Sequence, residues 1–260
     1  MIDAIYIPTL GRSDRQITFD NMPDEVKKIT FLVIQPKEKK AHSRYPCIVL
    51  PDNDIGITQT RKFIWDYGKK QKYFMMDDDV KMACRKPWHD GDKTKRIMTK
   101  SDWNYFLNTT SAWMDKGIFW GGCRTGGLPP SGKEYASNTG TAEVFFFDGK
   151  NLPDSENLDW DLSTAEDISL NLQLLIKGYQ NRVWDRFVYL SDYVGTQGGC
   201  ADMGRTLDMI NDNHDKLVKK FPRYVFYNGT RPLMGGTFNK IKVMYNKSYN
   251  QRELNLGEKI

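Results

Sequence analysis

The chain has 260 residues, of which 39% are hydrophobic and 13% aromatic, so it is long enough for one domain with a substantial core. Its formal net charge of +5 permits an anionic partner without requiring one. The four cysteines lie far apart without a CxxC pair, which argues against structural zinc and a disulfide framework and fits a reduced, cytoplasmic setting. No apolar run reaches the length of a signal-peptide core or a membrane-spanning helix.

The first 80 residues alternate between predicted strands and predicted helices. Strands are expected at residues 4–7, 29–34, 47–50 and 73–76, with a brief helix over residues 16–22 and a longer helix over residues 57–67. This alternation predicts an α/β fold with a mainly parallel sheet and right-handed crossovers.

The loop after the first strand contains Pro8, Thr9, Leu10, Gly11 and Arg12. Backbone N–H groups in such a loop, together with a guanidinium, can hold a nucleotide. The same residues are equally typical of an ordinary turn between a strand and a helix. Both interpretations therefore stay open on this loop alone.

The strand at residues 73–76 ends in three consecutive aspartates, Asp77, Asp78 and Asp79. Adjacent carboxylates repel one another, and a divalent cation is a natural counter-charge, because Mg²⁺ and Mn²⁺ prefer oxygen ligands. Strand ends in open α/β sheets are also where ligands bind. The alternative is a solvated acidic turn. The buried strand that precedes the aspartates favours the cation site.

The segment after residue 80 is predicted to begin with a polar, basic loop over residues 81–100. A helix over residues 103–116 follows, with Ser101 as its N-cap. Residues 119–127 form a strand and a glycine-rich turn, where glycine lets another backbone or a ligand approach closely. Further strands are expected at residues 141–148, 183–190 and 224–227, helices at residues 164–178 and 207–221, and loops at residues 128–139 and 191–200.

Glu166 and Asp167 lie in the first turn of a helix that Thr164 is expected to cap. The helix dipole favours negative charge at this end, so both acids have a complete structural explanation. A chemical role for Glu166 or Asp167 is indicated only when this pair is considered together with the motifs that precede it.

The C-terminal tail from Arg231 onward is basic and aromatic. Interleaved basic and aromatic residues can bind nucleic acid, but the commoner explanation is a solvated tail packed by its aromatic residues. His214, on the helix before this tail, is expected to be an exposed helix residue.

Taken in order, these motifs resemble those of GT-A glycosyltransferases, whose DxD motif at a strand end is matched by residues 77–79. Within that class the chain is similar to the TET-associated glycosyltransferases of bacteriophages, relatives of the base J glucosyltransferase. The matching segments are residues 6–12, 74–79 and 164–167, with Gly198, Gly199 and Arg205 further on.

The resemblance implies a single GT-A (Rossmann-like) domain over residues 1–260. Its central sheet would be mostly parallel and flanked by helices, with a small antiparallel portion on the acceptor side. Residues 1–80 would form the nucleotide-binding half, residues 101–221 the acceptor and catalytic half, and residues 222–260 a basic extension.

The implied activity is metal-dependent, inverting transfer of a sugar from a nucleotide-sugar, with a UDP-sugar favoured. The acceptor would be the hydroxymethyl group of 5-hydroxymethylcytosine or 5-hydroxymethyluracil in phage DNA, and the enzyme is expected to be a monomer in the host cytoplasm. Asp167, or else Glu166, would be the catalytic base. The Mn²⁺ or Mg²⁺ ligands would be Asp79, Asp77 and, in place of a late histidine, Asp192. The implied donor-binding residues are Pro8, Thr9, Leu10, Arg12, Asp52, Arg61, Asp77 and Asp78.

A DNA acceptor needs cationic surface, and the basic residues 85–96 and 240–252 are candidates for phosphate contacts. Trp88 is a candidate for stacking on a base that has been flipped out of the duplex. The implied acceptor or DNA contacts are Arg85, Lys86, Trp88, Arg124, Gly198, Gly199 and Arg205.

Other functions stay open on the sequence. A GT-A enzyme can act on a polysaccharide, lipid or protein, although the lack of a membrane segment and the basic charge argue mildly against this. A nucleotidyltransferase would need a glycine-rich loop with a nearby lysine, which residues 8–13 do not provide. A non-enzymatic DNA-binding module would not need intact Asp77, Asp79 and Asp167.

Overall fold

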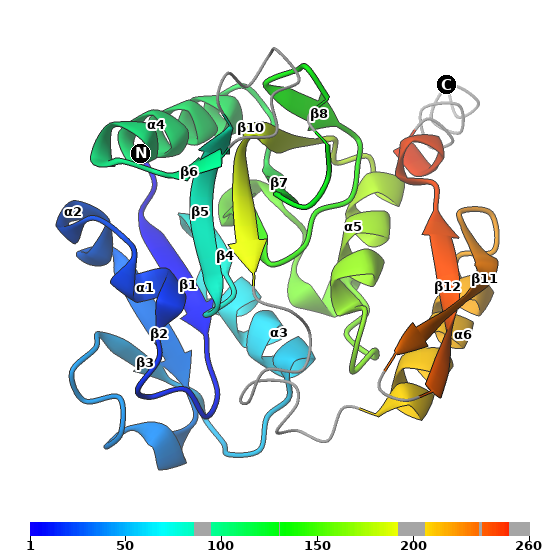
Figure 1. Ribbon diagram of the computed structural model, residues 1–260, viewed down its shortest axis with the longest axis horizontal. Helices are drawn as coiled ribbons and strands as arrows, with labels where there is room; N and C mark the ends of the chain where they lie inside the picture. The colour runs from blue at the N-terminus through cyan, green and yellow to red at the C-terminus, as the bar shows by residue number, and fades with distance from the viewer. Residues whose placement is uncertain (86–94, 130, 192–205, 234–235, 250–260) are drawn as a thin grey trace.

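A computed structural model describes residues 1–85, 95–129, 131–191, 206–233 and 236–249. A ten-stranded sheet lies at the centre in the order β3-β2-β1-β4-β9-β7-β10-β5-β6, and β8 pairs with β10 outside this order. A separate two-stranded sheet, β11-β12, lies to one side (Figure 1). The strands are β1 Ala4–Pro8, β2 Thr30–Ile34, β3 Cys47–Val49, β4 Lys72–Met76, β5 Val80–Arg85, β6 Lys95–Ile97, β7 Trp120–Thr125, β8 Tyr135–Ser137, β9 Val144–Asp148, β10 Asn181–Ser191, β11 Val225–Leu233 and β12 Gly236–Val243.

Helices cover both faces of the large sheet. Alternate residues of a strand point to opposite faces, so a strand of this sheet can pack against helices on both sides. On one face Ile5 and Phe74 pack with α1, α2 and α4, whereas on the other Tyr6 and Tyr73 pack with α3 and α5. Burial on both faces explains why these strands are continuous apolar runs in the sequence. The helices are α1 Ile17–Asp20, α2 Asp24–Lys27, α3 Ile57–Tyr67, α4 Lys100–Asp115, α5 Glu166–Ile176 and α6 Leu207–Lys220.

The α/β fold class is confirmed. Strands β3, β2, β1 and β4 run parallel, and the helix expected in this part of the chain is present as α3. Beyond β4 the described pairs are antiparallel except β7 with β10, so the antiparallel part is larger than expected. None of the helices in the described ranges combines the length and the hydropathy that crossing a bilayer requires.

The expectation of an irregular loop over residues 81–100 is wrong at residues 81–85 and 95–97, which belong to strands β5 and β6, whereas residues 86–94 lie outside the described residues. Antiparallel pairing of β5 with β10 helps to bury Met82, Ala83 and Cys84. The loop expected at residues 128–139 likewise contains β8, which also pairs with β10. Both strands depend on a partner far away in the sequence, so local composition did not reveal them.

Helix α4 is capped by Thr99 and not, as expected, by Ser101. The Thr99 hydroxyl accepts from the Asp102 backbone N–H, and the Asp102 carboxylate accepts from the Thr99 N–H at 2.8 Å, which completes a capping box. Arg96 pairs with both carboxylate oxygens of Asp102. Hydrogen bonds from Arg96, and secondarily from Thr99, hold the pKa of Asp102 below its usual range.

We expect Asp102→Asn to lower the free energy of unfolding at neutral pH by about 1 kcal/mol, because the variant loses the capping box and the ion pair. The folded-state pKa of Asp102 is depressed, so its stabilisation is present above the unfolded pKa of about 4 and is lost as the pH falls. Urea titrations should show wild type and variant converging below about pH 4. A difference that stays constant to pH 2 would contradict the ionic origin.

Residues 222–233 and 236–249 of the C-terminal extension are folded, which corrects the expectation of one short strand followed by a solvated tail packed by its aromatics. Strands β11 and β12 and helix α6 bury Leu217, Phe221 and Val225 together with Leu172 of α5. His214 is 9% exposed, with Nδ1 2.6 Å from the Asn239 carbonyl oxygen of β12, so it is not an exposed helix residue.

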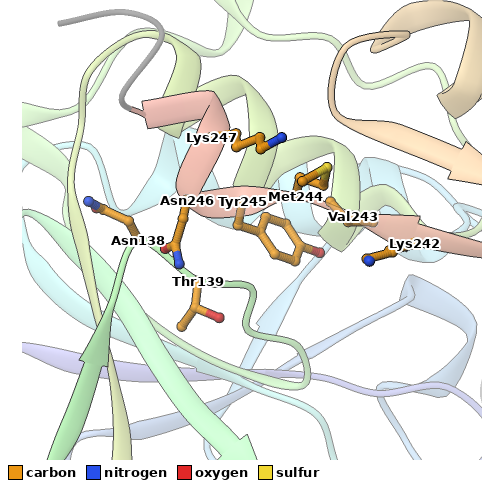
Figure 2. Close-up of a pocket in the computed structure, with 8 residues that line it drawn as sticks. All are labelled: Asn138, Thr139, Lys242, Val243, Met244, Tyr245, Asn246 and Lys247. Atoms are coloured by element: carbon orange, nitrogen blue, oxygen red, sulfur yellow. The ribbon is translucent and has the colours of Figure 1, made fainter.

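Tyr245, after β12, joins the extension to the main sheet domain. A Cβ atom on Gly140 would lie 2.4 Å from the Tyr245 ring, so the aromatic ring packs directly on this glycine. A hollow of about 260 Å³ lies between residues 138–139 and residues 242–247, and Figure 2 shows Tyr245 among the side chains that line it. The extension is therefore part of the wall beside the segment that leads into β9.

Candidate functional site

The carboxyl ends of β1 and β4 are adjacent, because the two strands are parallel neighbours with Tyr6 opposite Met75. The loop after β1 and the aspartates after β4 therefore meet at one edge of the sheet, where open α/β sheets bind ligands. The N-terminus of α5 reaches the same edge, since Glu166 contacts a partner shared with Asp77. The structure thus brings together the two acidic motifs that the sequence singled out.

Arg12 ties the first loop to the aspartates. Its guanidinium hydrogen-bonds Asp78 and lies 3.0 Å from Asp79 Oδ2, while the Thr9 hydroxyl donates to the other oxygen of Asp78. Gln16 Nε2 donates to Thr9 Oγ1 at 2.9 Å and to the Arg12 carbonyl at 2.7 Å, which fixes the loop. The loop after β1 is therefore a specific support for the aspartates.

Asp78 is 5% exposed and faces Thr9 and Arg12. Burial raises its pKa to about 6, against the opposing effects of the Arg12 charge and the Thr9 hydrogen bond. Asp79 and Asp77 are more accessible, with side chains 24% and 27% exposed. These two carboxylates, and not Asp78, are open to a ligand.

Arg61 of α3 connects the aspartates to α5. Its guanidinium lies 2.8 Å from Asp77 Oδ1 and 2.7 Å from Glu166 Oε1, and its side chain is only 6% exposed. Both terminal nitrogens of Arg61 already have carboxylate partners, so the geometry alone does not assign Arg61 to the donor. The expected role of Arg61 in donor binding stays a prediction. A buried arginine with two carboxylates fixes the distance between the two halves of the site.

Glu166 and Asp167 have different surroundings at the start of α5. Burial raises the pKa of Glu166, Arg61 opposes this shift, and the neighbouring Asp167 charge reinforces it. Within the part of the chain that the structure describes, the Asp167 carboxylate has no ion pair, while Asn171 holds its backbone carbonyl at 2.6 Å. Asp167 is therefore the member of the pair that is not occupied by an arginine.

The expected N-cap of α5 is wrong. Ala165, not Thr164, occupies the N-cap position, with a left-handed φ of 60° and no side-chain cap. The Thr164 hydroxyl is buried and has no hydrogen-bond partner among the described residues. Strain of this kind is concentrated at functional sites, and here it directly precedes the acidic pair.

Glu143 is a site residue that the sequence reasoning missed. Its carbonyl accepts from the Asp77 N–H at 2.8 Å, which places it at the end of β4. Burial, and then the nearby Asp77 charge, raises its pKa to about 7, while a hydrogen bond with Ser191 opposes the shift. The sequence signal for Glu143 was a charged residue directly before the buried apolar run of β9. Assigning this segment to a strand did not by itself give Glu143 a role.

Asp185 is a second missed residue, and it pairs with two of the residues expected to contact DNA. Its carboxylate lies 3.6 Å from Arg85 Nε, 3.2 Å from Arg124 Nη1 and 2.6 Å from the Ser131 N–H. Arg85 is 1% exposed, so its assignment as a DNA contact is wrong. A fully buried carboxylate needs these cations as partners, so Arg124 is also engaged in holding the fold.

The remaining expected residues divide into two groups. Pro8 and Thr9 are buried beside the aspartates, and Asp52 is exposed just after β3. Several others fall outside the described residues, and their roles stay predictions: Lys86, Trp88, Asp192, Gly198, Gly199 and Arg205.

The chemistry of Asp77 and Asp79 fits a hard divalent cation. Arg61 contacts one oxygen of Asp77 and Arg12 one oxygen of Asp79, so these arginines leave the second oxygen of each carboxylate unused. No group of three or more Asp, Glu, His or Cys side chains within the described ranges is arranged for a metal. Two carboxylates plus phosphate oxygens are nevertheless a normal Mg²⁺ environment.

An α/β sheet with carboxylates at its strand ends, linked to an acidic helix start, is the arrangement expected of a glycosyltransferase. Residues 3–199 match the family model of the TET-associated glycosyltransferases. The match covers well over half of the chain, which therefore belongs to this family and is a glycosyltransferase.

The chain is also similar to the beta-glucosyl-HMC-alpha-glucosyl-transferases of Enterobacteria phages T2 and T6. The T2 relative is 25% identical over 206 residues, 74% of this chain and 72% of the relative. The T6 relative is 25% identical over 231 residues, 83% of this chain and 80% of the relative. Among solved structures, S. aureus TarS 1-349 aligns with a TM-score of 0.47 and 15% identity over 84% of this chain and 66% of that chain. The same fragment in complex with UDP gives a TM-score of 0.45 and 12% identity over the same shares.

Proposed function

We propose that this enzyme transfers a sugar from a UDP-sugar to the hydroxymethyl group of a modified pyrimidine in DNA, with inversion at the anomeric carbon. The observation that carries the proposal is the link through Arg61, which joins Asp77 to Glu166 at 2.8 and 2.7 Å. It sets the leaving-group side and the acceptor side of one reaction next to each other. The phage relatives are named beta-glucosyl-HMC-alpha-glucosyl-transferases, and this name supports an HMC-containing DNA acceptor for the present chain.

The reaction divides the work between two groups of carboxylates. Asp77 and Asp79 would hold a divalent cation, which neutralises charge on the leaving diphosphate when it is bound. Arg12 and Arg61 keep these aspartates in place, and Asp167 takes the proton from the acceptor hydroxyl. The oxygen of that hydroxyl bonds to the anomeric carbon as the sugar–phosphate bond breaks, so the configuration inverts.

Lys240 and Lys242 of β12 are both exposed and provide a cationic surface for the DNA backbone. We expect Lys240→Glu combined with Lys242→Glu to weaken duplex binding uniformly across sequences, and the slope of log K against log salt to fall by about 2. Fluorescence anisotropy over a salt series measures both quantities. Lys116→Glu with Lys150→Glu is the matched control, since these exposed lysines lie outside β12. An equal loss in both double variants would contradict a specific role for β12.

A mass-spectrometric transfer assay tests the acceptor. Duplexes with cytosine, 5-hydroxymethylcytosine or 5-hydroxymethyluracil are incubated with a panel of UDP-sugars, with and without Mn²⁺. We expect a sugar increment only on hydroxymethylated DNA. Increments on a polysaccharide or protein acceptor, and none on any DNA, would replace this proposal with the polysaccharide or protein alternative.

A further inference from the structure

Glu143 adopts a backbone conformation that glutamate rarely takes. Its φ is +57°, in the left-handed region. Such a conformation costs a non-glycine residue on the order of 1 kcal/mol, and glutamate lacks the short side chain that lets asparagine or aspartate compensate. The hydrogen bond from the Asp77 N–H to the Glu143 carbonyl, at 2.8 Å, helps to hold this geometry. This backbone geometry places Glu143 next to the aspartates that follow β4.

The Glu143 carboxylate differs from the neighbouring aspartates and Glu166 in that its unpaired oxygen is buried. Its Oε2 atom is buried and has no hydrogen-bond partner among the described residues. Asp77, Asp78, Asp79 and Glu166 all pair with Arg12 or Arg61. Leaving a buried acceptor unpaired costs roughly 1–3 kcal/mol, more when it is charged, so a ligand that donates a hydrogen bond there is favoured.

The partner of Glu143 must be a hydrogen-bond donor. A phosphate is excluded by charge, and the described acidic side chains do not converge as a group of three around a cation. Ser191, at the end of β10, hydrogen-bonds to the Glu143 carboxylate and leaves Oε2 available. Sugar hydroxyls are neutral O–H donors, and the donor sugar is attached to the diphosphate that Asp77 and Asp79 face.

We propose that Glu143 accepts a hydrogen bond from a hydroxyl of the donor sugar and thereby selects which sugar is transferred. The inference rests on the proposed function for its nucleotide-sugar, but not on the identity of the acceptor. A buried polar group that is left unpaired strongly disfavours a ligand lacking the matching hydroxyl. Glu143 is thus a specificity residue, whereas Asp77 and Asp79 serve any sugar on the same diphosphate.

Calorimetric titration without any acceptor tests this role. UDP, a panel of UDP-sugars and single-deoxy analogues of the tightest binder are titrated into wild type, Glu143→Ala and Glu143→Gln. We expect Glu143→Ala to weaken the UDP-sugar by about 10–100-fold and UDP by less than about twofold. Glu143→Gln, which keeps a carbonyl acceptor, should lose less. Glu156→Ala, which removes an exposed acid outside the site, is the matched control.

The deoxy analogues separate a sugar contact from a structural effect. One analogue should bind wild type as weakly as the full sugar binds Glu143→Ala, and combining the two changes should add no further loss. Equal weakening of UDP and UDP-sugar in Glu143→Ala, or wild type that binds every deoxy analogue as tightly as the parent, would overturn the proposal. Titration of the deoxy analogues into wild type needs no variant, so it tests the proposal even if Glu143→Ala does not fold. Failure of DNA transfer alone leaves these titrations unaffected.

Discussion

Replacing Asp79 by alanine should reduce sugar transfer by about 10³-fold or more while leaving the fold intact, because it removes one of the two carboxylates proposed to hold the divalent cation at the leaving diphosphate. The fold should survive, since the Asp79 side chain is 24% exposed and Arg12 keeps its ion pair with buried Asp78. Initial rates measured by transfer of labelled sugar, with circular dichroism of the variant, check both parts.

Asp66→Ala is the matched control for Asp79→Ala. Asp66 is an exposed acid on α3 whose ion pair with Lys62 lies at 3.4 Å on the surface. Exposed pairs of this kind contribute at most about 1 kcal/mol, so transfer by the control should stay within about twofold of wild type. Undiminished transfer by Asp79→Ala would remove Asp79 from the reaction.

Asp167→Asn should lower the transfer rate by about 10²–10⁴-fold, the usual contribution of a general base, without weakening donor binding. The variant keeps the shape of the side chain, and the backbone carbonyl that Asn171 holds at 2.6 Å is unchanged. Single-turnover kinetics at saturating donor, compared with UDP affinity, separate the two effects.

Glu166→Gln provides the comparison for Asp167→Asn, because Glu166 is paired with Arg61 at 2.7 Å. We expect this variant to weaken donor binding and stability, since Arg61 loses one of its two carboxylate partners. If Glu166→Gln abolished the chemical step while Asp167→Asn did not, the base would be Glu166.

The first 80 residues were predictable because their signals are local. Apolar runs predicted the parallel strands, and the helical spacing of apolar residues predicted helix α3. The aspartates and the acidic pair were found as motifs, and the parallel neighbours β1 and β4 bring the first loop to the aspartates as the topology requires.

The missed strands and the missed Asp185 depend on contacts between distant segments. β5 is a strand because β10 pairs with it, and Asp185 of β10 pairs with Arg85 of β5 and with Arg124 of β7. The basic composition of residues 85–96 suggested a DNA-facing loop, but Arg85 is buried and acts as a structural cation. Glu143 was missed because its proposed role depends on a left-handed backbone conformation, which the residue type does not predict.

The C-terminal extension shows the same limit. Its basic and aromatic residues suggested a solvated tail packed by its aromatic residues; Tyr245 does pack against Gly140, but strand β12 was not expected. Burial, and then the nearby Asp167 charge, raises the pKa of Tyr245. The extension and helix α5 also share a hydrophobic cluster, so the two segments lie close together in the folded chain.

In the proposed reaction, Asp79 serves the leaving diphosphate and Asp167 serves the acceptor. Calorimetric titration of UDP, with and without Mn²⁺, into wild type, Asp79→Ala and Asp167→Asn distinguishes these two roles. We predict that Mn²⁺ strengthens UDP binding in wild type and Asp167→Asn alike, and that this strengthening is lost in Asp79→Ala. Strengthening by Mn²⁺ that persists in Asp79→Ala, or disappears in Asp167→Asn, would contradict the division of roles.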